Sequence, residues 1–194
     1  MSGKTDPQIV CEYLQSMGID GTNVLPTILQ RLEVELAEAR EQLARDGSAC
    51  LGSERLLARL AVTHGIAQSL LTGNTFANAA LKLSTFRLDR YLDLETGAYG
   101  SDHPDRLQLL PTALRRQAEL RGRIFEPSDV VVIGDSPNDL ACAKANGTRC
   151  VLVATGNYTI DQLYALGADE VLPNLADTER VMGTLIGTQA VLQD

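Results

Sequence analysis

Two short polar motifs, each directly after an apolar run, could carry chemistry in this chain. One of them, Gly134-Asp-Ser-Pro-Asn-Asp139, follows the β-branched residues 130–133. Such a run is typical of a strand buried in a parallel sheet, so Asp135 and Asp139 should lie at the carboxyl end of a strand, where α/β proteins bind ligands. Two carboxylates in one tight turn are oxygen ligands of the kind that Mg²⁺ takes. We therefore predict a magnesium site at Asp135 and Asp139.

The other motif is Thr72-Gly73-Asn74, which follows Leu70 and Leu71. The Thr72 hydroxyl and the backbone amides of Gly73 and Asn74 would lie near a helix N-terminus, an arrangement that suits a phosphate group. Each motif alone has an ordinary alternative, because either one could simply cap the helix that follows it. The two together, in this order and each after a buried strand, are more specific than either one.

At these motifs the sequence resembles the haloacid dehalogenase (HAD) superfamily of hydrolases, close to its helically capped, phosphoglycolate-phosphatase-like members. The stretch around Thr72 is similar to that family's second motif, whose hydroxyl binds the transferring phosphoryl group. The stretch with Asp135 and Asp139 is similar to its fourth motif, whose acidic residues hold Mg²⁺. Residues 98–106 and 154–158 are further similar stretches.

The resemblance implies Mg²⁺-dependent hydrolysis of a small phosphomonoester through an aspartyl-phosphate. Thr72 and the cation of a third motif would stabilise the phosphoryl oxygens. Arg106 is the first candidate for that cation and Lys82 the second, with an ordinary surface position as the alternative for each. The residues that we expect to bind the substrate are Thr72, Gly73, Asn74, Lys82 and His103.

One part of the family pattern has no counterpart in this sequence. The resemblance requires a nucleophile motif, Asp-x-Asp-x-Thr/Val, at the end of a first strand that precedes Thr72. Nothing before Thr72 has that form, and Asp93-Leu-Glu-Thr-Gly97 is interpreted as an ordinary strand end. We therefore expect a chain that begins within the cap and has negligible phosphatase activity by itself. The absent strand would lie between those at Ile66 and Val130, leaving open edges that could pair with another chain.

Other functions stay open at this stage. A non-catalytic HAD-like protein could keep the Mg²⁺ and phosphate pocket for binding or regulation. A phospho-acceptor receiver domain also has Asp residues at strand ends, but the helical lobe and the Thr72 motif argue against it. Removal of halide is less favoured than phosphate hydrolysis, because Asp135 and Asp139 point to the Mg²⁺-dependent branch of the superfamily.

The composition narrows the classes of partner. The chain has 194 residues, of which 44% are hydrophobic, and a net charge of −8 at pH 7. Its longest basic cluster is Arg115-Arg116, so we expect no nucleic-acid partner. No apolar run reaches membrane-spanning length and the N-terminal residues lack a signal-peptide core, so we expect a cytoplasmic protein with no membrane partner. The expected ligand is a small phosphorylated metabolite.

The spacing of apolar residues predicts a helical lobe followed by an α/β core. Helices are expected over 6–18 and 25–44, and the turn-rich residues 46–52 mark the boundary. The predicted domains are therefore a partial helical cap over 1–48 and a HAD-like core over 49–194. Strands are expected at 66–71, 90–94, 130–133, 150–154 and 170–172, with helices between them. This alternation predicts a doubly wound parallel, Rossmann-like sheet that lacks the first strand of the HAD core.

Overall fold

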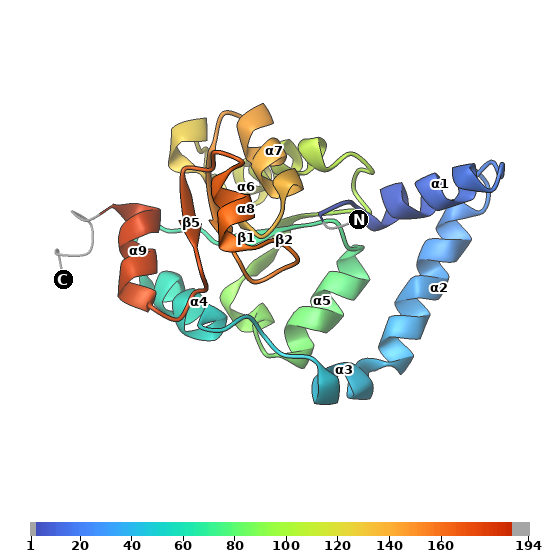
Figure 1. Cartoon of the computed structure of the whole chain (residues 1–194), viewed down its shortest axis with the longest axis horizontal. Coiled ribbons are helices and arrows are strands. Elements are labelled where there is room, and N and C mark those ends of the chain that lie inside the picture. The colour runs from blue at the N-terminus through green and yellow to red at the C-terminus, as the bar shows by residue number, and fades with distance from the viewer. Residues whose placement is uncertain (1–2, 188–194) are drawn as a thin grey trace. The chain divides into compact units, whose positions relative to one another are not determined.

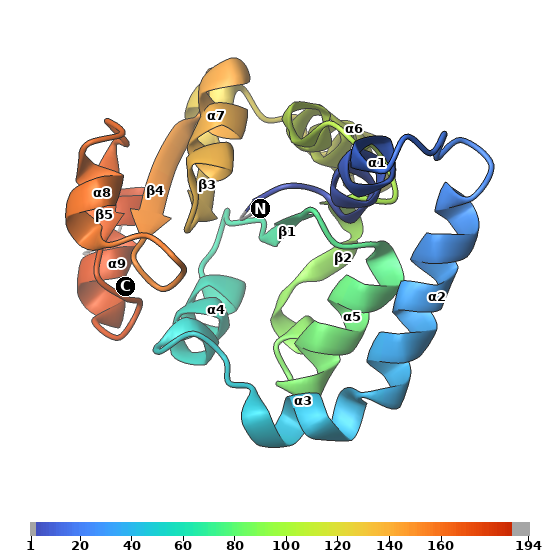
Figure 2. The same ribbon diagram turned by 45° about the vertical axis from the view of Figure 1, so that its right-hand side comes forward.

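The computed structural model describes residues 3–187, and their contacts divide into two compact units (Figures 1 and 2). In the described part of the chain, unit 1 comprises residues 3–48 and 69–123, and unit 2 comprises residues 49–68 and 124–187. One division falls after residue 48, where the turn-rich sequence predicts a boundary. Residues 69–123 group with the N-terminal helices because Asp6 N–H donates to Gly73 O at 2.7 Å and neighbouring contacts reinforce this bond.

Unit 1 combines helices with a small parallel sheet. Its elements are α1 (Asp6–Ser16), α2 (Leu25–Glu38), α3 (Arg40–Asp46), β1 (Ser69–Thr72), α5 (Phe76–Thr85), the 3₁₀ turn η1 (Asp89–Tyr91), β2 (Asp93–Tyr99), the 3₁₀ turn η2 (Arg106–Gln108) and α6 (Leu109–Arg121). The strands pair in parallel with Thr72 opposite Tyr99. The loops that follow β1 and β2 therefore share one edge of this sheet, the edge where α/β proteins bind ligands.

The N-terminal helices differ in detail from the prediction. Thr5 caps α1 by accepting the Gln8 N–H, and the helix ends at Ser16, two residues before the predicted end at residue 18. The single helix predicted over 25–44 is interrupted at Ala39, which separates α2 from α3. Both helices contact α5 (Figure 2), but no residue of α2 over 25–38 is buried, and Leu32 is 40% exposed. The apolar residues of α2 are thus only partly covered.

Unit 2 is a three-stranded parallel sheet with helices. Its elements are α4 (Ser53–Val62), the 3₁₀ turn η3 (Pro127–Asp129), β3 (Val131–Gly134), α7 (Pro137–Ala145), β4 (Arg149–Val153), α8 (Ile160–Tyr164), β5 (Glu170–Leu172) and α9 (Thr178–Ile186). The strand order is β3-β4-β5. A core cluster joins Leu56 of α4, Val151 of β4 and Val181 of α9, so α4 packs in this unit although it precedes β1 in sequence. No helix in residues 3–187 is long and apolar enough to cross a bilayer.

The predicted α/β class with parallel strands is confirmed, but the strands lie in two sheets instead of one. Within residues 3–187, β1 pairs only with β2, and β3 pairs with β4, so β1 and β3 are edge strands. The sequence analysis expected open edges at these same two strands. The strand predicted at 90–94 is wrong, because residues 89–91 form η1 and β2 runs over Asp93–Tyr99. The buried residues of β2 begin with Thr96 and Gly97, which lack the β-branched apolar pattern of the other strands.

Candidate functional site

The Thr72 motif forms a tight turn between β1 and α5, which we name the threonine turn (residues 72–75). Thr72 Oγ1 accepts the Asn74 N–H at 3.2 Å, and Asn74 O accepts the Gly100 N–H at 2.8 Å. A Cβ at Gly73 would lie 2.3 Å from Lys4 O, and a Cβ at Gly100 would lie 2.0 Å from Gly73 O. Backbones approach so closely here that a larger residue at either position would displace the loops.

Asp6, the first residue of α1, holds the threonine turn in place through two hydrogen bonds. Asp6 N–H donates to Gly73 O at 2.7 Å, and Asp6 Oδ2 accepts the Thr75 N–H at 3.1 Å. Burial raises the pKa of the Asp6 carboxyl, against the lowering effects of the Thr75 hydrogen bond and the Lys82 charge. Sequence reasoning missed this role, because an Asp before a Pro at a helix start is an ordinary cap signal.

The backbone N–H groups at the start of α5 already donate hydrogen bonds to other groups of the chain. The N–H groups of Asn74, Thr75 and Phe76 donate to Thr72 Oγ1, Asp6 Oδ2 and Ser101 Oγ, respectively. The hydroxyl hydrogen of Thr72 and the Nδ2 group of Asn74 have no hydrogen-bond acceptor among residues 3–187. The threonine turn can bind an anion through these two donors, since the backbone N–H of Asn74 already donates to Thr72 Oγ1.

Lys82, a predicted substrate-binding residue, is brought to the same turn. It lies on α5, and its Nζ donates to Asn74 Oδ1 at 2.5 Å. The Thr72, Gly73, Asn74 and Lys82 predictions therefore converge on one place in the structure.

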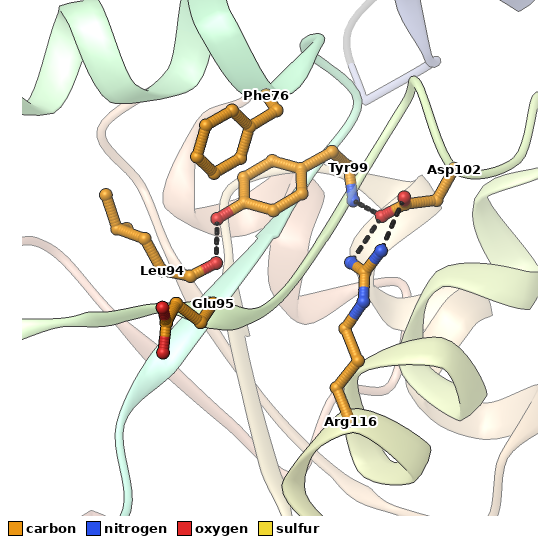
Figure 3. Close-up of a pocket in the computed structure, with 6 residues that line it drawn as sticks. All are labelled: Phe76, Leu94, Glu95, Tyr99, Asp102 and Arg116. Atoms are coloured by element: carbon orange, nitrogen blue, oxygen red, sulfur yellow. Dashed lines mark hydrogen bonds and ion pairs between the residues drawn. The ribbon is translucent and has the colours of Figure 1, made fainter. Parts of the chain in front are cut away.

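An ion pair anchors the loop that follows β2 (Figure 3). Arg116 of α6 donates to both carboxylate oxygens of Asp102, at 2.7 and 2.8 Å, and to Gly97 O at 2.5 Å. The carboxylate of Asp102 also accepts the Tyr99 N–H at 2.9 Å. Burial alone would raise the pKa of Asp102, but the hydrogen bonds from Arg116 and Tyr99 lower it below its ordinary value. The loop is thus fixed at its first turn.

Arg106 and His103 lie further along this loop and are both partly buried. Asp105 caps η2, which begins at Arg106, and its N–H donates to His103 Nδ1 at 2.9 Å. The fully buried Thr5 hydroxyl donates to Pro104 O at 2.5 Å. The segment before α1 therefore contacts both the threonine turn and the loop that carries the two predicted residues.

A pocket of about 190 Å³ lies beside this anchor, and its lining residues are drawn in Figure 3. The residues that line it are Phe76, Leu94, Glu95, Tyr99, Asp102 and Arg116. The Tyr99 ring meets Phe76 edge to face at 5.0 Å, its hydroxyl donates to Leu94 O at 2.6 Å, and burial raises the pKa of Tyr99 to about 12. The polar groups of Tyr99, Asp102 and Arg116 bond to one another or to the backbone, and these bonds stabilise the loop that follows β2. None of the predicted site residues lines the pocket.

Unit 2 carries the acidic motif as a turn between β3 and α7, which we name the aspartate turn (residues 134–139). Asp139 Oδ2 accepts the N–H of Asp135 at 3.1 Å and both the N–H and the hydroxyl of Ser136, at 3.0 and 2.6 Å. The Asp139 side chain is buried and closes a capping box at the start of α7. Helix capping, the ordinary alternative for this motif, thus accounts for one oxygen of Asp139.

Asp135 differs from Asp139 in its surroundings. A Cβ at Gly156, in the loop after β4, would lie 2.0 Å from Asp135 Oδ2, so this glycine makes room for the carboxylate. Among residues 3–187, no three or more His, Cys, Asp or Glu side chains are grouped to hold a metal ion. Mg²⁺ needs only one or two protein carboxylates besides water and phosphate oxygens. The donor set therefore fits Mg²⁺ through Asp135, whereas Oδ2 of Asp139 already accepts three hydrogen bonds within the turn.

Comparisons with known proteins agree with the family resemblance. Residues 108–178 match the model of the HAD-hydrolase-like family. A conserved haloacid dehalogenase-like protein of unknown function from Agrobacterium tumefaciens has a similar structure, with a TM-score of 0.58 and 19% identity over 92% of this chain and 90% of that chain. Segment 108–178 of the chain is similar to HAD-like hydrolases. A predicted phosphatase from Clostridium acetobutylicum is also similar, with a TM-score of 0.61 and 16% identity over 92% of this chain and 78% of that chain.

The matched segment contains the aspartate turn but not the threonine turn, which lies before residue 108. At these identities the two structural likenesses show the fold alone. The comparison with curated proteins found no match. The superfamily prediction is confirmed, while the phosphoglycolate-phosphatase-like subtype stays a prediction.

Proposed function

We propose that this HAD-like protein binds the phosphate of a small phosphorylated metabolite at the threonine turn and Mg²⁺ at the aspartate turn, as part of a phosphomonoester hydrolase. The observation that supports the proposal is the pair of donors, the Thr72 hydroxyl hydrogen and the Asn74 Nδ2 group, with no acceptor among residues 3–187. Hydrogen bonds from fixed donors to phosphoryl oxygens are the electrostatic stabilisation that this chemistry needs.

Each residue has a definite task in this proposal. Thr72 donates its hydroxyl hydrogen to a phosphoryl oxygen, because Asn74 N–H already occupies one lone pair of Oγ1. Arg106 supplies a permanent positive charge from the loop after β2. Asp135 would hold Mg²⁺, and the bound ion would supply positive charge at the aspartate turn. The attacking aspartate of the family mechanism is not assigned to any residue of this chain, so we expect negligible turnover by these 194 residues alone.

The threonine turn is tested by calorimetric titration with inorganic phosphate in the presence of Mg²⁺. We expect Thr72→Val to weaken phosphate binding about tenfold, because a hydrogen bond to a charged group contributes about 1.5–3 kcal/mol. Asp135→Asn should weaken Mg²⁺ binding in a separate titration with the metal alone. Thr112→Val is the matched control, since the Thr112 hydroxyl donates only to Gln108 O in the described chain. Equal phosphate affinity of Thr72→Val and Thr112→Val would contradict the proposal.

The second candidate is a non-catalytic protein that keeps both binding sites for a regulatory role. The observation that favours it is the sequence itself, which has no Asp-x-Asp-x-Thr/Val motif before Thr72. Phosphate binding without hydrolysis of p-nitrophenyl phosphate by these 194 residues would fit both candidates. Turnover by the pure chain that Asp135→Asn abolishes would exclude the second candidate and would also contradict the negligible turnover that the first one expects. A cytoplasmic location and self-association through the edges of β1 and β3 complete the proposal.

A further inference from the structure

The contact between Lys82 and Asn74 fixes which way the Asn74 side chain faces. Lys82 Nζ donates to the side-chain oxygen of Asn74 at 2.5 Å. An ammonium group has three donors and no acceptor, so it must face the oxygen of the amide and not its nitrogen. The Nδ2 group is therefore turned away from Lys82, and both of its hydrogens stay available for a ligand.

We propose that Lys82 is a positioning residue that acts on a bound phosphate through Asn74, by holding the amide so that Nδ2 donates to a phosphoryl oxygen. This inference rests on the proposed function of the threonine turn and deepens it. It also revises the sequence-based expectation for Lys82, which was direct contact with the substrate or with the phosphoryl charge. A cation bonded to the amide oxygen polarises the amide, which makes the Nδ2 hydrogens stronger donors.

The surroundings of Lys82 support a positioning role. Side chains on a helix tilt toward its N-terminus, and Lys82 of α5 therefore reaches back to the turn that precedes this helix. The nearby charge is the carboxylate of Asp6, whose Oδ2 accepts the Thr75 N–H within the same turn. The Lys82 ammonium is thus attracted both by the Asn74 amide oxygen, to which it donates, and by the charge of the Asp6 carboxylate. Lys82 is exposed, and these two attractions favour one orientation of its long side chain.

Direct contact and positioning make different predictions for a double-mutant cycle. If Lys82 acts through Asn74, the effect of Lys82→Met on phosphate binding should largely disappear once Asn74 is Ala. If Lys82 contacts the phosphate itself, Lys82→Met should weaken binding by the same factor in both backgrounds. Lys82→Arg should restore most of the wild-type affinity, because the guanidinium keeps the charge and the donor.

The experiment is calorimetric titration with inorganic phosphate and Mg²⁺ on the full chain, the two single variants and the double variant. We expect about tenfold weaker binding for Lys82→Met, for Asn74→Ala and for the double variant alike. Lys144→Met is the matched control, because Lys144 donates to Leu166 O on another part of the chain and should leave phosphate affinity unchanged. Thermal melting of each variant separates loss of binding from loss of folding.

The outcomes separate the inference from the function on which it rests. Phosphate binding that Thr72→Val weakens but Lys82→Met does not would overturn the role of Lys82 and leave the threonine turn in place. Multiplicative effects of Lys82→Met and Asn74→Ala would overturn positioning in favour of direct contact. Absence of phosphate binding by the wild-type chain would overturn the proposed function and the inference together.

Discussion

Asp135 and Asp139 look equivalent in the sequence, yet their carboxylates have different tasks. Asp139 Oδ2 accepts three donors inside the aspartate turn, whereas Asp135 lies against the space that Gly156 leaves. The pair of acidic residues was visible from sequence, because it follows a β-branched run. The different surroundings of the two carboxylates could not be predicted from sequence, because they depend on the position of the loop after β4. The side-chain roles proposed for Asp135 and Asp139 stay predictions.

The ion pair between Asp102 and Arg116 gives a prediction about pH at the scale of single residues. The folded-state pKa of Asp102 is lower than its ordinary value, so its contribution to stability is present at neutral pH. That contribution should be lost as the pH falls below about 4 and through the folded-state pKa. Asp102→Asn should therefore lower the free energy of unfolding at pH 7 by about 1–2 kcal/mol. The variant should also lose less of its free energy of unfolding than the wild type as the pH falls.

Urea unfolding at a series of pH values checks this prediction. Glu119→Gln is the control on the same helix, because the ion pair of Glu119 with Arg115 is exposed, and exposed ion pairs contribute little to stability. An Asp102→Asn profile that runs parallel to the wild-type profile at every pH would show that Asp102 does not couple folding to protons.

At the scale of elements, the start of α4 depends on a single glycine. Gly52 is the cap residue of α4 with φ of +86°, and a Cβ there would lie 2.1 Å from Leu175 O. Gly65, after the end of the same helix, has φ of +80° but no atom within 4 Å of an added Cβ. The two glycines share a backbone conformation and differ in crowding, so they form a matched pair.

We expect Gly52→Ala to destabilise unit 2 far more than Gly65→Ala. Both substitutions place a side chain in the left-handed region, at a cost of about 1 kcal/mol. Only Gly52→Ala also forces the backbone at Leu175 to move, which should raise the total loss above about 3 kcal/mol. Thermal melting followed by circular dichroism measures the stability of both variants. Equal decreases in melting temperature would mean that the backbone at Leu175 moves aside without a cost in free energy.

The sequence predicted the elements whose burial follows from apolar periodicity and missed those that polar residues hold. Strands β3, β4 and β5 were found because their residues are mostly β-branched or otherwise apolar. Strand β2 was misplaced because its buried part begins with the polar residue Thr96, whose hydroxyl bonds to distant partners such as Gln117 on α6 at 2.6 Å as well as to the nearby Asp93 O. The hydrogen bond that the Thr75 N–H donates to Asp6 joins residues that are 69 positions apart, which no local pattern can indicate.

At the scale of the whole chain, the described strands leave two sheets with open edges. Parallel sheets are normally buried on both faces, but every residue of β1 is partly exposed and Ile133 of β3 is 41% exposed. An exposed apolar edge strand is a template for pairing with another chain. The self-association that we propose should therefore proceed through backbone pairing at these edges.

Sedimentation velocity over a range of concentrations tests this proposal. We expect concentration-dependent association of the wild-type chain, and Ile133→Lys should reduce it, because a charged side chain on an edge strand opposes pairing. Ile124→Lys is the control, since Ile124 is 82% exposed and lies outside the strands. Equal reduction by both substitutions would indicate a general effect of charge, and a wild-type chain that stays monomeric at all concentrations would contradict pairing. Loss of association only in Ile133→Lys would locate the contact on β3, because the two variants carry the same net charge.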